Sequence, residues 1–125
     1  RLIIATPVPT SVTMGGTLFA DLLMKAPDID AVFCVNDDLA LGTLFECQRR
    51  QIQVPEDIAI VGFNDLDYMA SAVPPLSSVR TNRYDMGKTA ITMVMDAIEG
   101  KRPATPVVDL GYELMIRRSS APRRT

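Results

Sequence analysis

The chain has no histidine and no tryptophan, and only two cysteines, among its 125 residues. Without histidine it cannot form a Ser-His-Asp triad, a Cys-His nucleophile pair or a zinc site with a histidine ligand, so most hydrolase mechanisms are excluded. Cys34 and Cys47 each lie within an apolar segment and lack the C-x-x-C spacing of a metal site or redox motif. We therefore expect two buried thiols and a reducing compartment.

Long hydrophobic runs are also missing. No stretch approaches the roughly 20 apolar residues of a membrane helix, and no basic segment followed by an apolar run opens the chain. The composition, 47% hydrophobic and 22% charged, is typical of a globular protein. The length suits one domain with its own core. We expect no contact with a membrane.

Positive charge is scarce in most of the chain. Four basic residues crowd the C-terminus, namely Arg117, Arg118, Arg123 and Arg124, so residues 1–116 hold nine positive against 15 negative charges, a net charge of −6. An acidic surface repels phosphate backbones. This segment is therefore not expected to bind DNA itself.

Hydrophobic periodicity alternates between short apolar runs and helical stripes, which is the pattern of β-α-β units. Ser11 or Thr13 can cap the first helix, and Asn36 or Asp37 the second. The run at residues 31–35 is continuously apolar, as in a strand that is covered on both faces. An α/β fold with a parallel sheet flanked by helices is therefore predicted. Strands are expected at residues 2–5, 31–35, 58–63, 76–80, 106–110 and 113–117, the last two around a turn at Gly111-Tyr112, and helices at residues 14–23, 38–51 and 83–99.

Polar residues follow each of the first three expected strands. In an open parallel sheet, ligands bind beyond the carboxyl ends of the strands, so these residues are candidates for a binding site. Amides and carboxylates together offer donors and acceptors, which suits a polyhydroxylated ligand. The alternative is that they only cap helices and shape turns. The candidate ligand-binding residues are Thr10, Ser11, Asn36, Asp37, Asn64 and Asp65.

Features of catalysis are missing. Acidic pairs could hold a divalent cation or act as general acid and base, but the chain has no Gly-rich phosphate loop, no activated nucleophile and no cofactor fingerprint. We therefore expect no enzyme, no catalytic residue, no metal site and no cofactor.

Four segments resemble the LacI/GalR-type transcriptional repressors, in order and at the family's spacing. They are DAVFCVNDDLALG at residues 30–42, VPEDIAIVGFND at 54–65, PPLSSVR at 74–80 and ELMIRRS at 113–119. The resemblance implies part of a type I periplasmic-binding-protein-like effector domain, in which two α/β lobes enclose a small-molecule cleft. Residues 1–75 and 106–118 would belong mainly to the C-terminal lobe, and residues 76–105 would form a crossover and a helix of the N-terminal lobe. DNA would bind only through a domain that precedes Arg1.

The resemblance also indicates the effector. Asn36 and Asp37 match residues with which the family contacts its ligand. Asn64 stands where many members have an aspartate that binds ligand hydroxyls, and Thr10 stands near where many have a stacking aromatic residue. The lost negative charge at position 64 favours a sugar acid over a neutral sugar. The Pro-rich opening and the Met-rich helix 83–99 resemble the gluconate-operon repressors, so we expect a cytoplasmic protein that binds a sugar or sugar acid.

A homodimer is the last implication of the resemblance. Its interface would use the helix after the Asn-Asp pair and the loop after the third strand, with Leu41, Phe45, Met69 and Ala72. Helix 38–51 supports this, because its apolar residues cover more than one sheet-facing stripe. Alternatively, all of these side chains face the core. A secreted sugar-binding protein of the same fold and a small α/β enzyme are the competing functions, and the free cysteines on core strands argue against secretion.

Overall fold

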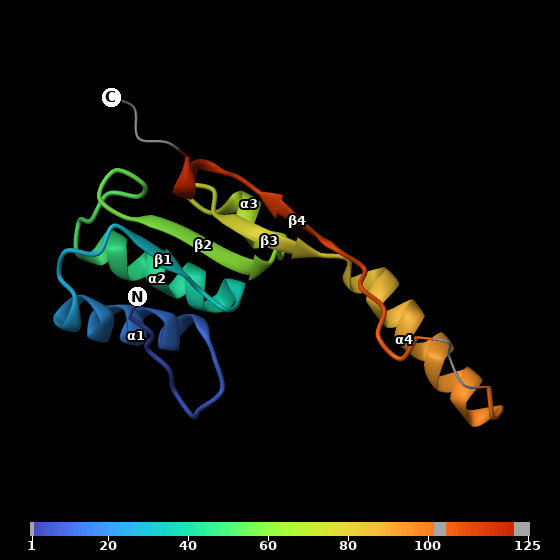
Figure 1. The fold of residues 1–125 in the computed structure, drawn as a ribbon. Helices are drawn as coiled ribbons and strands as arrows, with labels where there is room; N and C mark the ends of the chain where they lie inside the picture. Colours follow the sequence, from blue (N-terminus) through green and yellow to red (C-terminus); the bar gives the residue numbers. More distant parts are fainter. Residues whose placement is uncertain (1, 102–104, 122–125) are drawn as a thin grey trace. The chain divides into compact units, whose positions relative to one another are not determined.

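An open sheet forms the centre of the computed structural model, which describes residues 2–101 and 105–121. Its strands lie in the order β1-β2-β3-β4 (Figure 1). β1 (Ala31–Phe33) and β3 (Ser77–Thr81) pair in parallel with β2 (Ala59–Asn64), and β4 (Tyr112–Met115) lies beside β3. The predicted α/β fold with a mostly parallel sheet is confirmed. Arg123 and Arg124 of the basic C-terminus lie outside the described residues.

Each long helix begins after a residue whose side chain accepts a hydrogen bond from a free backbone N–H of the first turn, as an N-cap does. Ser11 Oγ accepts from Met14 N at 3.1 Å, and Asn36 Oδ1 accepts from Leu39 N at 3.0 Å. Ser11 and Asn36 are thus the caps, rather than Thr13 and Asp37. The helices are α1 (Val12–Lys25), α2 (Asp37–Arg49), α3 (Tyr68–Ser71) and α4 (Arg83–Ile98), with a 3-10 turn η1 (Arg118–Ser120) near the end.

Helices α1 and α2 approach each other through glycines. A Cβ atom on Gly42 would lie 1.9 Å from the Val12 carbonyl oxygen, and one on Gly15 would lie 2.4 Å from the Leu39 carbonyl oxygen. No side chain fits at either position, so the close packing of the two helices depends on both glycines.

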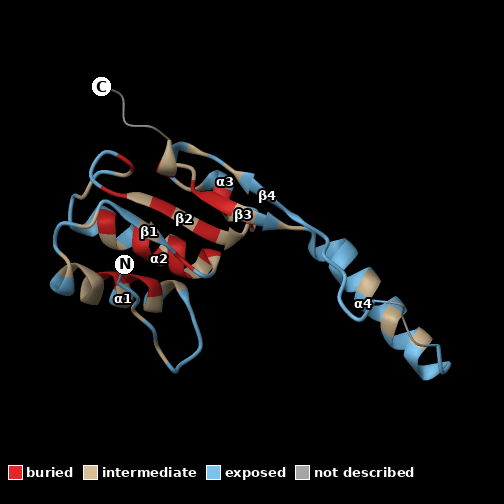
Figure 2. Cartoon of the chain, viewed as in Figure 1, coloured by how far each residue is buried: buried red, intermediate tan, exposed pale blue. Residues whose placement is uncertain are grey.

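The core lies between these helices and the sheet, in the unit formed by residues 1–80 and 114–125 (Figure 2). Both cysteines are buried free thiols, as expected. Burial raises the pKa of Cys34 to about 11 and that of Cys47 to about 12. The largest fully buried apolar side chains are those of Phe19, Leu44, Ile58, Ile60, Met69 and Leu76.

Two of the expected strands do not form. Residues 2–5 and 106–110 have no regular structure, because neither segment has a neighbouring strand with which to pair its backbone in the described sheet. Tyr112 begins β4 instead of closing a turn, while Gly111 takes the left-handed conformation with φ 70°.

The expectation that residues 31–35 are covered on both faces is also wrong. Alternate side chains point to opposite faces of a strand. Cys34 is buried, whereas Phe33 and Val35 are 60% and 67% exposed. β1 is the edge strand, and only one of its faces packs on the core.

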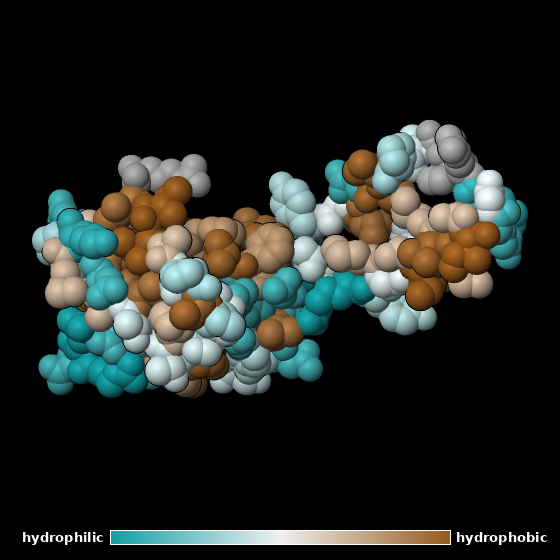
Figure 3. All heavy atoms as spheres, turned by 90° about the horizontal axis from the view of Figure 1, so that it is seen from below, coloured by the Kyte–Doolittle hydropathy of each residue, from teal (hydrophilic) through white to brown (hydrophobic). Residues whose placement is uncertain are grey.

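The second unit, residues 81–113, is built on α4. Gly100, with φ 77°, follows the end of this helix as expected. None of the side chains of α4 is buried, and its large apolar side chains Met86, Ile91, Val94, Met95 and Ile98 are exposed. Hydrophobic atoms of this unit are visible at its surface (Figure 3). Among the described helices, none is long and apolar enough to cross a membrane.

Candidate functional site

Asn36 connects the end of β1 to the loop before α1. Its Nδ2 donates a hydrogen bond of 2.7 Å to Thr10 Oγ1, while its Oδ1 caps α2. The side chain therefore has the capping role that the alternative interpretation gave it, and it also brings Thr10 to the carboxyl end of the sheet. Ser11 is engaged as the cap of α1.

Asn64 lies at the same level of the sheet on the neighbouring strand. Phe33 of β1 is paired with Val61 of β2, and Asn36 and Asn64 each come three residues after that pair. Asn64 is half-buried and has φ 110°. Its side-chain amide makes no hydrogen bond within the described residues. A non-glycine residue with such a φ is strained, which is common at functional sites. Thr10, Asn36 and Asn64 together form what we call the carboxyl-edge site.

Asp37 has a different environment from the one expected of a ligand contact. Its side chain is fully buried. One carboxylate oxygen accepts a hydrogen bond from Leu66 N at 2.7 Å, and the other accepts one from Ser78 Oγ at 2.7 Å. Both oxygens are thus occupied by groups that tie α2 to the loop after β2 and to β3.

Asp65 is likewise engaged inside the protein, although it stands next to Asn64. Arg117 Nη1 donates to one carboxylate oxygen at 2.6 Å and Arg80 Nε donates to the other at 2.8 Å. Burial alone would raise the pKa of Asp65, but the hydrogen bonds and charges of Arg117 and Arg80 outweigh it and lower the pKa below its ordinary value. The carboxylate is therefore ionised and neutralised by two arginines.

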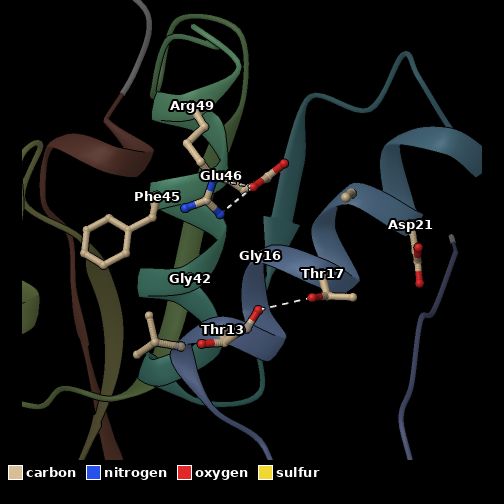
Figure 4. Close-up of a pocket in the computed structure, with 10 residues that line it drawn as sticks. Thr13, Gly16, Thr17, Asp21, Gly42, Phe45, Glu46 and Arg49 are labelled. Carbon is tan, nitrogen blue, oxygen red and sulfur yellow. Dashed lines mark hydrogen bonds and ion pairs between the residues drawn. The ribbon is translucent and has the colours of Figure 1, made fainter.

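A separate hollow of about 410 Å³ lies between α1 and α2 (Figure 4). Asp21 belongs to its α1 side, and Glu46 and Arg49 to its α2 side. Hydrogen bonds from Arg50 and Arg49 lower the pKa of Glu46. This hollow shares no residue with the carboxyl-edge site. The sequence analysis did not predict this hollow. Its only signal in the sequence is the pair of helix glycines, Gly15 and Gly42, which allow α1 and α2 to approach closely. Its lining is Val12, Thr13, Gly16, Thr17, Ala20, Asp21, Gly42, Phe45, Glu46 and Arg49.

The residues expected at a dimer interface divide into two groups. Phe45 is 41% exposed, and Leu41 and Ala72 are half-buried. Met69 is fully buried in the core, where it cannot touch a partner.

No group of three or more metal-binding side chains is found among the described residues.

The comparisons with known proteins agree with this fold. Residues 5–120 match the model of the periplasmic binding protein-like domain. The chain belongs to this family. The HTH-type transcriptional regulator GntR of Pseudomonas aeruginosa is 48% identical over 117 residues, which are 94% of this chain and 34% of that protein. The chain spans about a third of the length of the curated relatives it matches.

Solved structures of the family show the same fold. The structure of the transcription regulator GntR from Chromobacterium violaceum has a TM-score of 0.82 and 47% identity, covering 91% of this chain and 42% of that one. The complex of the transcriptional regulator CelR with cellobiose has a TM-score of 0.82 and 33% identity, covering 88% of this chain and 34% of that one. The resemblance to LacI-type regulators is confirmed, and these relatives are regulators rather than enzymes.

Proposed function

We propose that this chain is the effector-binding and dimerising portion of a cytoplasmic LacI-type transcriptional repressor, with a sugar acid of the gluconate class as its effector. The observation that carries the proposal is the position of Thr10, Asn36 and Asn64 at the carboxyl end of a parallel sheet, where ligands of such folds bind. Effector binding would change lobe closure, and closure would change the spacing of DNA-binding heads outside this chain.

The lobes follow from the same proposal. Residues 1–75 and 106–118 are assigned mainly to the C-terminal lobe, and residues 76–105 to a crossover and a helix of the N-terminal lobe. The separate unit at residues 81–113 supports a division into two parts, but its bounds differ: residues 76–80 stay with the sheet unit, and residues 106–113 belong to the other unit. The exposed apolar side chains of α4 also support it, because a helix of a complete lobe buries one face.

None of the three residues of the carboxyl-edge site carries a negative charge, which supports an anionic effector. Asn64 contributes a neutral amide. The nearby carboxylates of Asp37 and Asp65 are both taken up by internal hydrogen bonds and ion pairs. An incoming sugar carboxylate would therefore meet amide and hydroxyl groups rather than an unpaired acid. A secreted sugar-binding protein is not favoured, because the relatives are transcriptional regulators.

The decisive variant is Asn64→Asp in the full-length protein. A new carboxylate a few ångströms from a bound acid repels it by about 1–4 kcal/mol, depending on screening. We expect calorimetry to show an affinity for D-gluconate that is weaker by about fivefold or more, and no comparable change for neutral D-glucose. Asn82→Asp, at the cap of α4, is the matched control and should leave both affinities unchanged. Equal losses for the acid and the neutral sugar would contradict the charge argument.

The proposed homodimer places Leu41, Phe45 and Ala72 at the interface between two copies. The exposure of Phe45 supports this assignment, whereas Leu41 and Ala72 also pack against the core. A twofold axis near Leu41 would bring the two copies of that side chain together.

A further inference from the structure

Asp65 connects the two strands through which the chain leaves and re-enters the sheet unit. Arg80 of β3 is the last residue of that unit before the chain passes into residues 81–113. Arg117 lies just after β4, shortly after the chain returns at Leu114. Both arginines donate to the one carboxylate of Asp65, at 2.8 and 2.6 Å. One side chain thus holds both connecting strands.

The burial of this carboxylate argues against a direct contact with a ligand. The Asp65 side chain is only 3% exposed. Ion pairs in which the donor and the acceptor are both charged are among the strongest hydrogen bonds, and removing one partner of a buried pair leaves an uncompensated charge. The two guanidinium groups therefore compete strongly with any ligand for Asp65.

The backbone of Asp65 joins this arrangement to the carboxyl-edge site. Asn64 and Asp65 have φ values of 110° and 55°, so two successive non-glycine residues are held in strained conformations. Asp65 N donates to Ser78 Oγ at 3.1 Å, and Ser78 Oγ donates to the buried Asp37 at 2.7 Å. Asp65 is held through both its backbone and its side chain, so a displacement of Asn64 would strain these hydrogen bonds and ion pairs.

We infer that Asp65 is a positioning residue, which transmits effector contact at Asn64 to the two connecting strands without touching the effector. The inference rests on the proposed function for the identity of the effector, but the fixing of the strands is independent of it. Both arginines come from segments that resemble the family, Arg80 from PPLSSVR and Arg117 from ELMIRRS.

The test compares Asp65→Asn with the wild type in the full-length protein, by calorimetry and hydrogen exchange. Without ligand, the amides of residues 77–81 and 112–115 should exchange at least tenfold faster in the variant. Its Kd for D-gluconate should stay within threefold of the wild-type value. D-gluconate should slow exchange in these strands in the wild type and should fail to do so in the variant. A residue with a purely structural role would leave that response intact.

Asp67→Asn is the matched control, because Asp67 is exposed, lies two residues away and makes no capping hydrogen bond. It should behave as the wild type. If Asp65→Asn does not fold, Arg80→Gln removes one of the two ion pairs at a half-exposed side chain and should give the same pattern with a smaller exchange effect.

Two further outcomes would overturn the inference. Unchanged exchange in both strands would show that Asp65 does not hold them. A tenfold or larger loss of D-gluconate affinity with unchanged ligand-free exchange would make Asp65 a ligand contact. If the wild type gives no heat with D-gluconate, the gluconate part of the proposed function fails, and the ligand-free exchange then tests only whether Asp65 holds the two strands.

Discussion

Replacing Asn36 with alanine removes two interactions that the structure assigns to one side chain. The first is the cap of α2, in which Oδ1 accepts from Leu39 N at 3.0 Å. Loss of such a cap costs about 0.5–2 kcal/mol. The second is the 2.7 Å hydrogen bond to Thr10, whose loss costs about 0.5–1.5 kcal/mol. We therefore expect the Asn36→Ala protein to be about 1–3.5 kcal/mol less stable.

The same substitution should weaken effector binding. An amide contact in a desolvated site contributes about 1–3 kcal/mol, so the affinity for D-gluconate should fall roughly tenfold or more. Asn36→Ser separates the two effects, because serine caps a helix as well as asparagine does but lacks the amide. We expect Asn36→Ser to recover much of the stability lost in Asn36→Ala and to bind D-gluconate as weakly.

Urea unfolding followed by circular dichroism measures the stability, and calorimetry measures the affinity. Unchanged D-gluconate affinity in Asn36→Ala would remove Asn36 from the site. Equal stability losses for alanine and serine would refute the capping argument.

Three further predictions concern the contact between α1 and α2, the proposed dimer interface and the buried thiols. Gly42→Ala places a Cβ atom 1.9 Å from the Val12 carbonyl oxygen and should lower the free energy of unfolding by about 1–3 kcal/mol. Gly87→Ala is the control, because a Cβ atom there has nothing within 4 Å, and it should not lower the free energy of unfolding. Equal urea midpoints for the two variants would contradict this prediction. Leu41→Arg should convert dimers to monomers in sedimentation, because like charges would meet at a twofold axis; a variant that stays dimeric refutes the interface. With thiol pKa values of about 11 and 12, Cys34 and Cys47 should react slowly with a thiol reagent at pH 8 and quickly in denaturant; fast reaction of the folded protein would show that they are accessible.

Local signals in the sequence predicted much of this fold. Helices α1, α2 and α4 have apolar periodicity and side-chain caps that lie within a few residues of one another, so their positions follow from short segments. The expected strands at residues 2–5 and 106–110 were wrong, because a strand also needs a partner that is distant in the sequence. The one-sided burial of β1 depends likewise on its place at the sheet edge.

The candidate site was predictable as a set of positions, but its internal roles were not. The order of the strands placed Asn36 and Asn64 at one edge. The partners that occupy Asp37 and Asp65 come from far along the chain, with Ser78 separated from Asp37 by 41 residues and Arg117 from Asp65 by 52. Periodicity and capping rules contain no information on such pairings. The arginines were nonetheless visible in two of the segments that resemble the family.

The most direct test is a nuclear magnetic resonance titration of the full-length protein, uniformly labelled with ¹⁵N so that backbone amides and asparagine side-chain amides are both observed. The signals of Asn36 and Asn64 would be assigned with the Asn36→Ser and Asn64→Asp variants. Because ligands of this fold bind beyond the carboxyl ends of the strands, both signals should shift in a saturable manner as D-gluconate is added, while that of Asn82 stays in place. If the Asn36 and Asn64 signals stay unchanged while backbone signals of Thr17 and Gly42 shift, the ligand occupies the hollow between α1 and α2, and the carboxyl-edge site is not the effector site.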